Sequence, residues 1–219
     1  GADQLVGGAG LDAADYTSSA SAVAINLDGS LSAGGDAAGD TLSSIERVIG
    51  SAFDDTLTGT AANEVLEGAG GNDALYGGGG SDTLDGGAGN DLLNGGAGAD
   101  TLIGGAGFDT VDYSGSASAV NVRLDGTPSS GGDAAGDSLS GIEGVIGSAN
   151  DDQLTGGTAN DVLDGASGND QISGGVGDDS LIGRSGDDIL EGGAGADALD
   201  GGAGNDTASY ANAVAGVAV

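Results

Sequence analysis

Aliphatic residues recur at every ninth position along two long stretches of the chain. Each stands between outward-pointing neighbours, as in Thr83-Leu84-Asp85, which is typical of a short strand with one buried side chain. Glycines fill much of the rest of each nine-residue repeat, here called a nonad. They predict turns, because glycine reaches positive φ cheaply and disfavours a helix. The pattern therefore predicts stacked short strands around a thin core, with two nonads in each coil. The aliphatic series are Val48, Leu57, Leu66, Leu75, Leu84, Leu93, Leu102 and Val111, then Val145, Leu154, Leu163, Ile172, Leu181, Leu190 and Leu199, ending at Ala208.

A longer repeat encloses the nonads. Residues 15–111 align without a gap with residues 112–208, at an offset of 97. We interpret the sequence as an excerpt from a longer array, since duplication of one unit adds length to a solenoid. The predicted segments are the tail of a preceding unit at 1–15, a connecting segment at 16–49, a first array at 50–112, a connecting segment at 113–146, a second array at 147–209 and the start of a next unit at 210–219.

Acidic residues stand two positions before the aliphatic residues of the arrays. Residues eighteen apart, such as Asp73 and Asp91, are expected to stack on one edge of coils about 4.8 Å apart. Carboxylates at that separation repel one another, so a ladder of them is unfavourable unless cations lie between the rungs. The candidate metal ligands are Asp12, Asp55, Glu64, Asp73, Asp82, Asp91, Asp100, Asp109, Asp152, Asp161, Asp170, Asp179, Asp188, Asp197 and Asp206.

Calcium is the cation that this chemistry favours. Ca²⁺ takes about six to eight oxygen ligands, including carboxylates and the backbone carbonyls that glycine turns can expose. Zn²⁺ would want His or Cys, of which the chain has none, and Mg²⁺ prefers a tighter octahedron. Filling every gap would take about five ions per array. Because one aliphatic side chain per nonad makes a thin core, we expect the metal-free chain to be largely disordered.

The nonads resemble the repeats-in-toxin (RTX) family, whose repeat is G-G-x-G-x-D-x-U-x with U aliphatic. A good match is Gly86-Gly87-Ala88-Gly89-Asn90-Asp91-Leu92-Leu93-Asn94. The resemblance implies an all-β fold, a Ca²⁺-binding parallel β-roll. It also implies export by a one-step type I system and folding in the calcium outside the cell.

Several nonads depart from the pattern. Glycine is missing at the second and fourth positions of the nonads that begin at Gly50, Gly59 and Gly147. Glu64 replaces the usual Asp, and Arg184 replaces a glycine and brings a positive charge near Asp188. The ion sites at the start of each array and beside Arg184 are therefore the uncertain ones.

The connecting segments abandon the nonad. In the first, Val23, Ile25 and Leu27 alternate with polar or small residues and predict a half-buried strand, followed by a turn at Asp28-Gly29. Tyr16 and its counterpart Tyr113 are expected to cap the core. A polar loop at 34–40 is either a solvated turn or a further ion site through Asp36 and Asp40, with Asp133 and Asp137 in the second copy. Residues 40–48 could start with a helix cap, but the nonad register of Val48 favours strand.

Composition narrows the classes of partner. The net charge is -32, with 35 acidic residues against three arginines, which disfavours nucleic acid as a partner. No apolar run is long enough for a membrane span. The chain has no His, Cys or Lys for base or nucleophilic chemistry, and its acidic pairs are all equivalent, so we expect no enzyme activity.

Two functions from different classes remain. The first is a calcium-rigidified structural array in an adhesin, surface layer (S-layer) or extracellular fibre at the bacterial cell surface. The second is an accessory secretion and folding module of a type I-secreted protease, lipase or epimerase. The long repeat favours the first. Shared Ca²⁺ could also bridge copies, so self-association into fibres or layers stays open.

Overall fold

The computed structural model describes residues 1–211, so the predicted start of a next unit at 210–219 lies outside the described residues except for its first two positions. The chain divides into two compact units. The first comprises Gly1–Thr110 with Ser140–Ile142, and the second comprises Val111–Leu139 with Glu143–Val219. Within the described residues, no helix is both long and apolar enough to cross a membrane.

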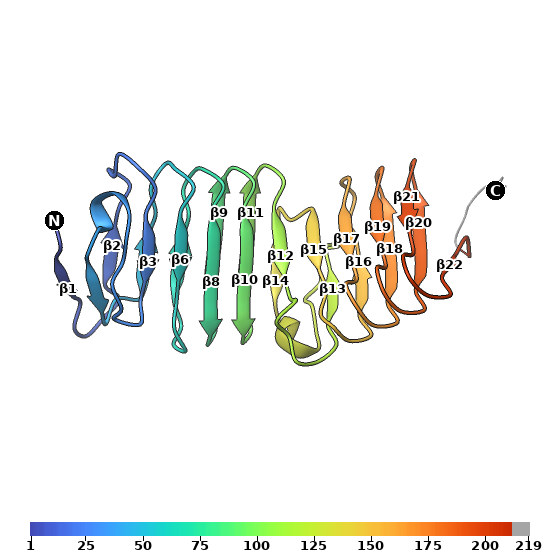
Figure 1. Ribbon diagram of the computed structural model, residues 1–219, viewed down its shortest axis with the longest axis horizontal. Coiled ribbons are helices and arrows are strands. Elements are labelled where there is room, and N and C mark those ends of the chain that lie inside the picture. Colours follow the sequence, from blue (N-terminus) through green and yellow to red (C-terminus); the bar gives the residue numbers. More distant parts are fainter. Residues whose placement is uncertain (212–219) are drawn as a thin grey trace. The chain divides into compact units, whose positions relative to one another are not determined.

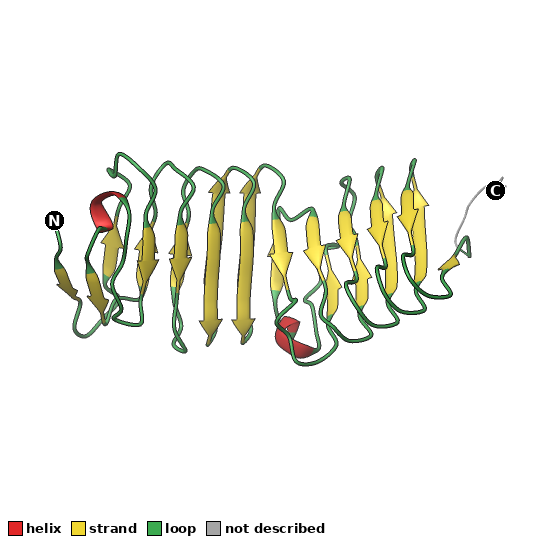
Figure 2. Ribbon diagram, viewed as in Figure 1, coloured by secondary structure: helices red, strands yellow, loops and turns green. Residues whose placement is uncertain are grey.

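Short parallel strands make up nearly all of the regular structure in both units (Figures 1 and 2). Those of the first unit are β1 (Gln4–Val6), β2 (Ala13–Asp15), β3 (Ala24–Asn26), β4 (Thr41–Ser43), β5 (Arg47–Ile49), β6 (Thr56–Thr58), β7 (Val65–Glu67), β8 (Ala74–Gly79), β9 (Thr83–Ala88), β10 (Leu92–Ala97) and β11 (Thr101–Ala106). The boundary between the units falls in β12 (Thr110–Asp112) and β14 (Ser138–Ser140). The second unit has β13 (Asn121–Arg123), β15 (Gly144–Ile146), β16 (Gln153–Thr155), β17 (Val162–Asp164), β18 (Gln171–Val176), β19 (Ser180–Ile182), β20 (Ile189–Ala194), β21 (Ala198–Asp200) and β22 (Thr207–Ala208).

Each unit is a parallel β-roll with two sheets built from alternate nonads. In the first unit one sheet runs β3, β6, β8, β10, and the other runs β2, β5, β7, β9, β11. In the second unit the sheets run β15, β17, β19, β21 and β13, β16, β18, β20, β22. Array residues pair with the residue eighteen positions away, as Leu93 does with Leu75. The predicted all-β fold and two-nonad coil are confirmed.

The core is one column of aliphatic side chains per sheet. Leu57, Leu66, Leu75, Leu84 and Leu93 are all fully buried, and the second array repeats this with Leu163 and Leu181. In β9 the residues that flank Leu84 are partly exposed, as predicted. The core is therefore as thin as the spacing implied, because each nonad contributes one large apolar side chain.

Strands in the most regular nonads are longer than predicted. β8, β9, β10, β11, β18 and β20 each span six residues and include both glycines that open the next nonad. Gly87 pairs in register with Gly105 although its φ is 99°. A methyl group on Gly87 would lie 2.5 Å from the carbonyl oxygen of Ala69, so glycine at this position lets the two coils stack closely.

The first connecting segment closes one roll and opens the next. Its strand β4 pairs with β1 of the preceding tail, while its strand β3 pairs with β6 of the first array. Between them lie a turn with Gly29 at φ 83° and a single-turn 3-10 helix at Gly35–Ala37, which the sequence reading placed in a polar loop. Residues 41–43 and 47–49 are strands, as the nonad register favoured. Tyr16 and Tyr113 are both buried, which agrees with their expected place beside the core.

Candidate metal sites in the carboxylate ladders

The acidic residues form two vertical ladders in each array, with neighbours eighteen residues apart. The backbone N–H of each acid donates to the carboxylate of the acid one coil later. Asp73 N–H donates to Asp91 Oδ1 at 2.7 Å, and Asp82 N–H donates to Asp100 Oδ1 at 2.8 Å. The same bond links Asp55 to Asp73, Glu64 to Asp82, Asp91 to Asp109, Asp152 to Asp170, Asp161 to Asp179, Asp170 to Asp188, Asp179 to Asp197 and Asp188 to Asp206. The predicted stacking is thus present, and the protein itself satisfies one oxygen of each carboxylate.

The second carboxylate oxygen is where a cation fits. In several ladder residues Oδ2 is buried and accepts no hydrogen bond from the described residues. A buried charged oxygen without a partner is costly, so its recurrence in successive coils is the arrangement expected where a cation binds. These residues are Asp12, Asp73, Asp82, Asp91, Asp170, Asp179 and Asp188.

A backbone carbonyl shares the same small space. A methyl group on Gly86 would lie 2.7 Å from the carbonyl oxygen of Gly104 and nearer still to Asp91 Oδ2. The equivalent position in the second array is Gly183, where the two oxygens belong to Gly201 and Asp188. Glycine at the first nonad position therefore leaves room between a carboxylate and a carbonyl, which is the oxygen donor set that Ca²⁺ prefers.

Side chains alone do not assemble a metal cluster. Among residues 1–211, no group of three or more acidic, His or Cys side chains is arranged to hold an ion. A site in the ladders would therefore combine carboxylates with backbone carbonyls. That donor set has no nitrogen or sulfur and is poorly suited to Zn²⁺.

Burial changes the acidity of the ladder. It raises the pKa of Asp73 and of Asp170 to about 7, and neighbouring carboxylates add to the effect. The pKa of Asp82 and of Asp161 rises to about 6 for the same reason. Removing a carboxylate from water disfavours its charged form, so the metal-free ladder holds protons more tightly than an unfolded chain.

A pH dependence follows for the chain in chelator. Because the folded pKa of these carboxylates is raised above the unfolded value of about 4, protonation favours the folded state. Stability is retained at low pH and lost as the pH rises from about 4 through about 7. We expect more β structure in chelator at pH 5 than at pH 8, measured by far-UV circular dichroism. Equal spectra at the two pH values would contradict this prediction.

The start of each array differs from the rest. Ser51 donates its hydroxyl to Asp55 Oδ1 at 2.9 Å, and Thr60 donates its hydroxyl to Glu64 Oε1 at 2.6 Å. In the second array Asp161 Oδ2 accepts the Gly157 N–H at 2.6 Å. Protein donors thus occupy these carboxylates, in the nonads whose sites the sequence made uncertain.

Arg184 lies elsewhere than the sequence suggested. Its guanidinium forms an ion pair with Asp164, twenty residues earlier, and Asp188 Oδ2 still has no hydrogen-bond partner among the described residues. The expectation of a charge beside Asp188 is therefore corrected, because the long side chain reaches back across the coil. Asp164 is buried, so it gains from a cationic partner.

Asp36 and Asp40 do not form a further ion site together. Asp36 is exposed, whereas Asp40 is buried and accepts hydrogen bonds from Asp3 N–H at 2.8 Å and from the Tyr16 hydroxyl at 3.1 Å. Asp133 is only partly buried, while Asp137 is fully buried and accepts the Tyr113 hydroxyl at 2.8 Å. Asp40 therefore fits neither of the two alternatives from the sequence, a solvated turn or a further ion site. It extends the ladder of carboxylates into the connecting segment.

Sequence reasoning missed two features of the ladders. Glu46 accepts the Asp12 N–H at 3.1 Å and so continues a ladder; its place two residues before Val48 was a usable signal. A further ladder of Asn and Asp side chains runs beside the carboxylate ladder that contains Asp55 and Asp73. In it, Asn72 N–H donates to Asp54 Oδ1 at 2.7 Å, and Asn90 N–H donates to Asn72 Oδ1 at 2.8 Å. Recurrent Asn and Asp one position before the ladder acid were visible in the sequence.

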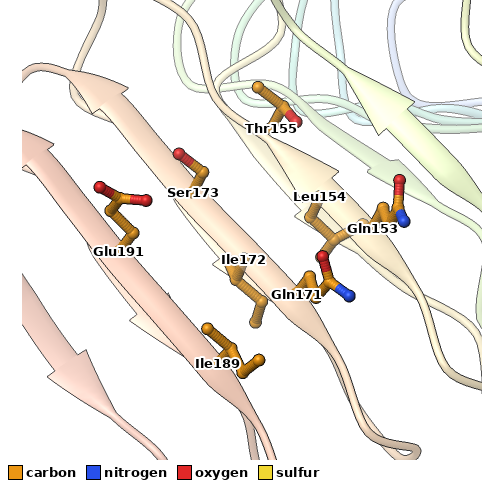
Figure 3. A pocket seen from close by; sticks show the side chains of 8 residues that line it. All are labelled: Gln153, Leu154, Thr155, Gln171, Ile172, Ser173, Ile189 and Glu191. Carbon is orange, nitrogen blue, oxygen red and sulfur yellow. The ribbon is translucent and has the colours of Figure 1, made fainter. Parts of the chain in front are cut away.

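A shallow pocket of about 170 Å³ lies on the outer face of β16, β18 and β20 (Figure 3). Gln153 and Gln171 lie on one side of it, and Glu191 is the only carboxylate in its lining. The lining includes no ladder residue and no His, Cys or Lys. The lining of this pocket therefore holds no pair of side chains suited to acid–base catalysis, and the pocket does not support a catalytic function.

A family model described as the RTX calcium-binding nonapeptide repeat matches four segments of the chain. They are residues 40–75, 76–111, 146–181 and 173–208, which together cover more than half of the sequence. No curated protein matches the chain significantly.

Proposed function

The chain belongs to the RTX calcium-binding nonapeptide repeat family, and we propose that it is a structural module that folds and stiffens on Ca²⁺ outside the cell. Calcium binding is the property of the repeat family. The location, the structural role and the individual ligands are our proposal.

The buried, unpartnered Oδ2 atoms are the observation that supports it most strongly. In Asp73, Asp91 and Asp179 one carboxylate oxygen accepts a backbone N–H, and the other shares a space with a glycine carbonyl. Ca²⁺ supplies positive charge and binds several such oxygens at once, which links successive coils. Residues with a buried Oδ2 that has no hydrogen-bond partner among the described residues are the ones we assign as ligands. They are Asp12, Asp73, Asp82, Asp91, Asp170, Asp179 and Asp188.

The remaining candidates fall into two groups. Asp100, Asp109, Asp197 and Asp206 each accept the backbone N–H of the acid one coil earlier, so they continue the same ladders and stay proposed ligands. Asp55, Glu64, Asp152 and Asp161 have protein donors on both sides of the carboxylate or on Oδ2. About five ions per array is accordingly an upper value.

A structural role fits the duplicated unit better than a catalytic one. Each array repeats one metal-binding geometry along its length, and repetition extends a solenoid without adding new chemistry. We propose an adhesin, surface layer or extracellular fibre on a bacterial surface, reached by type I secretion. The accessory module of a secreted protease, lipase or epimerase is the second candidate. Many further copies of the 97-residue unit in the parent protein would favour the first, and an adjacent catalytic domain the second.

Direct binding measurements test the proposal. Equilibrium dialysis of the full chain should show several Ca²⁺ bound per molecule, cooperatively, because each ion orders the coil that the next ion needs. Mg²⁺ and Zn²⁺ in parallel dialysis should bind much more weakly, since carbonyl-rich sites suit neither. Equal binding of Mg²⁺, or no binding of Ca²⁺ at millimolar concentration, would reject the proposal.

A further inference from the structure

Each array begins with a coil whose turns differ from those that follow. In the first array this coil is residues 50–67 and in the second it is residues 147–164. Together with the connecting segment before it, each makes a junction, which we define as residues 16–67 and 113–164. The second position of a nonad is glycine in most later turns but Ser51, Thr60 and Ser148 in the junctions.

The hydroxyl groups of Ser51, Thr60 and Ser148 donate hydrogen bonds to the carboxylates of their own turns. Asp55 accepts the Ser51 hydroxyl and the Val23 N–H on Oδ1, at 2.9 and 2.7 Å, while its Oδ2 accepts the Ser51 N–H. Glu64 accepts the Thr60 hydroxyl at 2.6 Å on one oxygen and the Thr60 N–H at 3.2 Å on the other. Both carboxylates are buried, and both of their oxygens are satisfied by the protein.

The second junction repeats the arrangement independently. Asp152 accepts the Ser148 hydroxyl and the Val120 N–H on Oδ1, each at 2.8 Å, and the Ser148 N–H on Oδ2 at 2.6 Å. The tyrosine of each connecting segment acts in the same way, since Tyr16 donates to Asp40 and Tyr113 to Asp137. In each junction, hydroxyl groups thus donate to buried carboxylates.

Two of the three arginines form ion pairs with carboxylates at equivalent positions of the two arrays. Glu67 and Asp164 correspond at the 97-residue offset, and each closes the second nonad of its array. Arg47, from the connecting segment, binds Glu67 at 2.8 Å, whereas Arg184, from a later coil, pairs with Asp164. The two arginines come from non-equivalent positions, so the shared target points to a common requirement of the first coil.

We infer that the junctions fold without metal and that the metal sites begin in the coil after them. Beyond the first coil, ladder residues such as Asp73, Asp91 and Asp179 have a buried Oδ2 with no hydrogen-bond donor among the described residues. In the junctions, hydroxyl donors and paired guanidinium groups stabilise buried carboxylates, a role that we assign to Ca²⁺ farther on. The inference rests on the proposed function for those later coils. It makes each junction a template on which calcium-dependent coils can stack.

A matched pair of variants tests the ion count. Asp55→Asn and Asp91→Asn change equivalent residues on the same ladder, two coils apart. Calcium bound to the full chain is counted by equilibrium dialysis. We expect Asp91→Asn to lose at least one bound ion and Asp55→Asn to keep the wild-type number. Equal losses in the two variants would overturn the inference while leaving the proposed function intact.

Hydrogen exchange in chelator tests metal-free folding directly. Amides at 48–58 and 145–155 of the wild-type chain should exchange at least about tenfold more slowly than those at 83–94 and 180–191. Ser51→Ala and Ser148→Ala should remove about tenfold of that protection at their own junction. Ser81→Ala, which alters an exposed turn residue, should not.

Uniform rapid exchange along the wild-type chain in chelator would overturn the inference. So would full protection in the two hydroxyl variants. A chain that binds no calcium at all would reject the proposed function, and the exchange experiment would then decide the present inference by itself.

Discussion

In excess chelator at pH 8 the chain is expected to lose most of its far-UV circular dichroism signal for β structure and to regain it when millimolar Ca²⁺ is restored. The core holds one aliphatic residue per nonad, such as Leu84 or Leu93, which buries little apolar surface against the entropy of ordering nine residues. The same coils carry buried carboxylates without donors on Oδ2. We therefore expect folding and ion binding to be linked.

The ion specificity of that transition is its control. Mg²⁺ at the same concentration should restore little of the signal, and a high concentration of monovalent salt should not substitute, because screening does not place a ligand between buried oxygens. The residual signal in chelator is assigned to the two junctions. A spectrum that is unchanged between chelator and Ca²⁺ would contradict the prediction.

A methyl group at the first position of a nonad is expected to be nearly as damaging as removal of the metal from that coil. In Gly86→Ala the new Cβ would lie 2.7 Å from the Gly104 carbonyl oxygen and closer still to Asp91 Oδ2. The methyl group would thus fill the space between two proposed calcium ligands. Overpacking of this kind costs about 1–3 kcal/mol. Because several ions bind together with folding, this cost should raise the Ca²⁺ concentration at the folding midpoint about twofold.

Gly115→Ala is the matched control for this variant. A Cβ at Gly115 meets no atom within 4 Å, and φ at neither Gly86 nor Gly115 lies in the left-handed range. The comparison therefore separates the steric effect from the general effect of glycine replacement on the unfolded chain. Calcium titrations followed by circular dichroism give both midpoints. Equal midpoints for the two variants would show that the space beside Asp91 is not used.

The sequence by itself determined the repeating part of the molecule. A period of nine fixed which side chain of each strand points inward, and a coil of eighteen placed Asp73 beneath Asp91. These features follow from local geometry, since alternation along a strand and glycine at positive φ act within a few residues. Sequence also singled out the irregular nonads at Gly50, Gly59 and Gly147.

Only the tertiary structure decided which donor is hydrogen-bonded to each carboxylate oxygen. A backbone N–H donates a hydrogen bond to one oxygen of each ladder carboxylate. The prediction from sequence had carboxylates stacked on one another and did not include these hydrogen bonds. Tyr16 reaches Asp40 across 24 residues, and Arg184 turns back to Asp164 instead of staying near Asp188. Periodicity constrains the backbone that all copies share, but the partner of a long or polar side chain depends on neighbours brought from other coils. The division between carboxylates that accept hydroxyl groups and carboxylates whose Oδ2 has no hydrogen-bond partner among the described residues therefore became visible only in the folded chain.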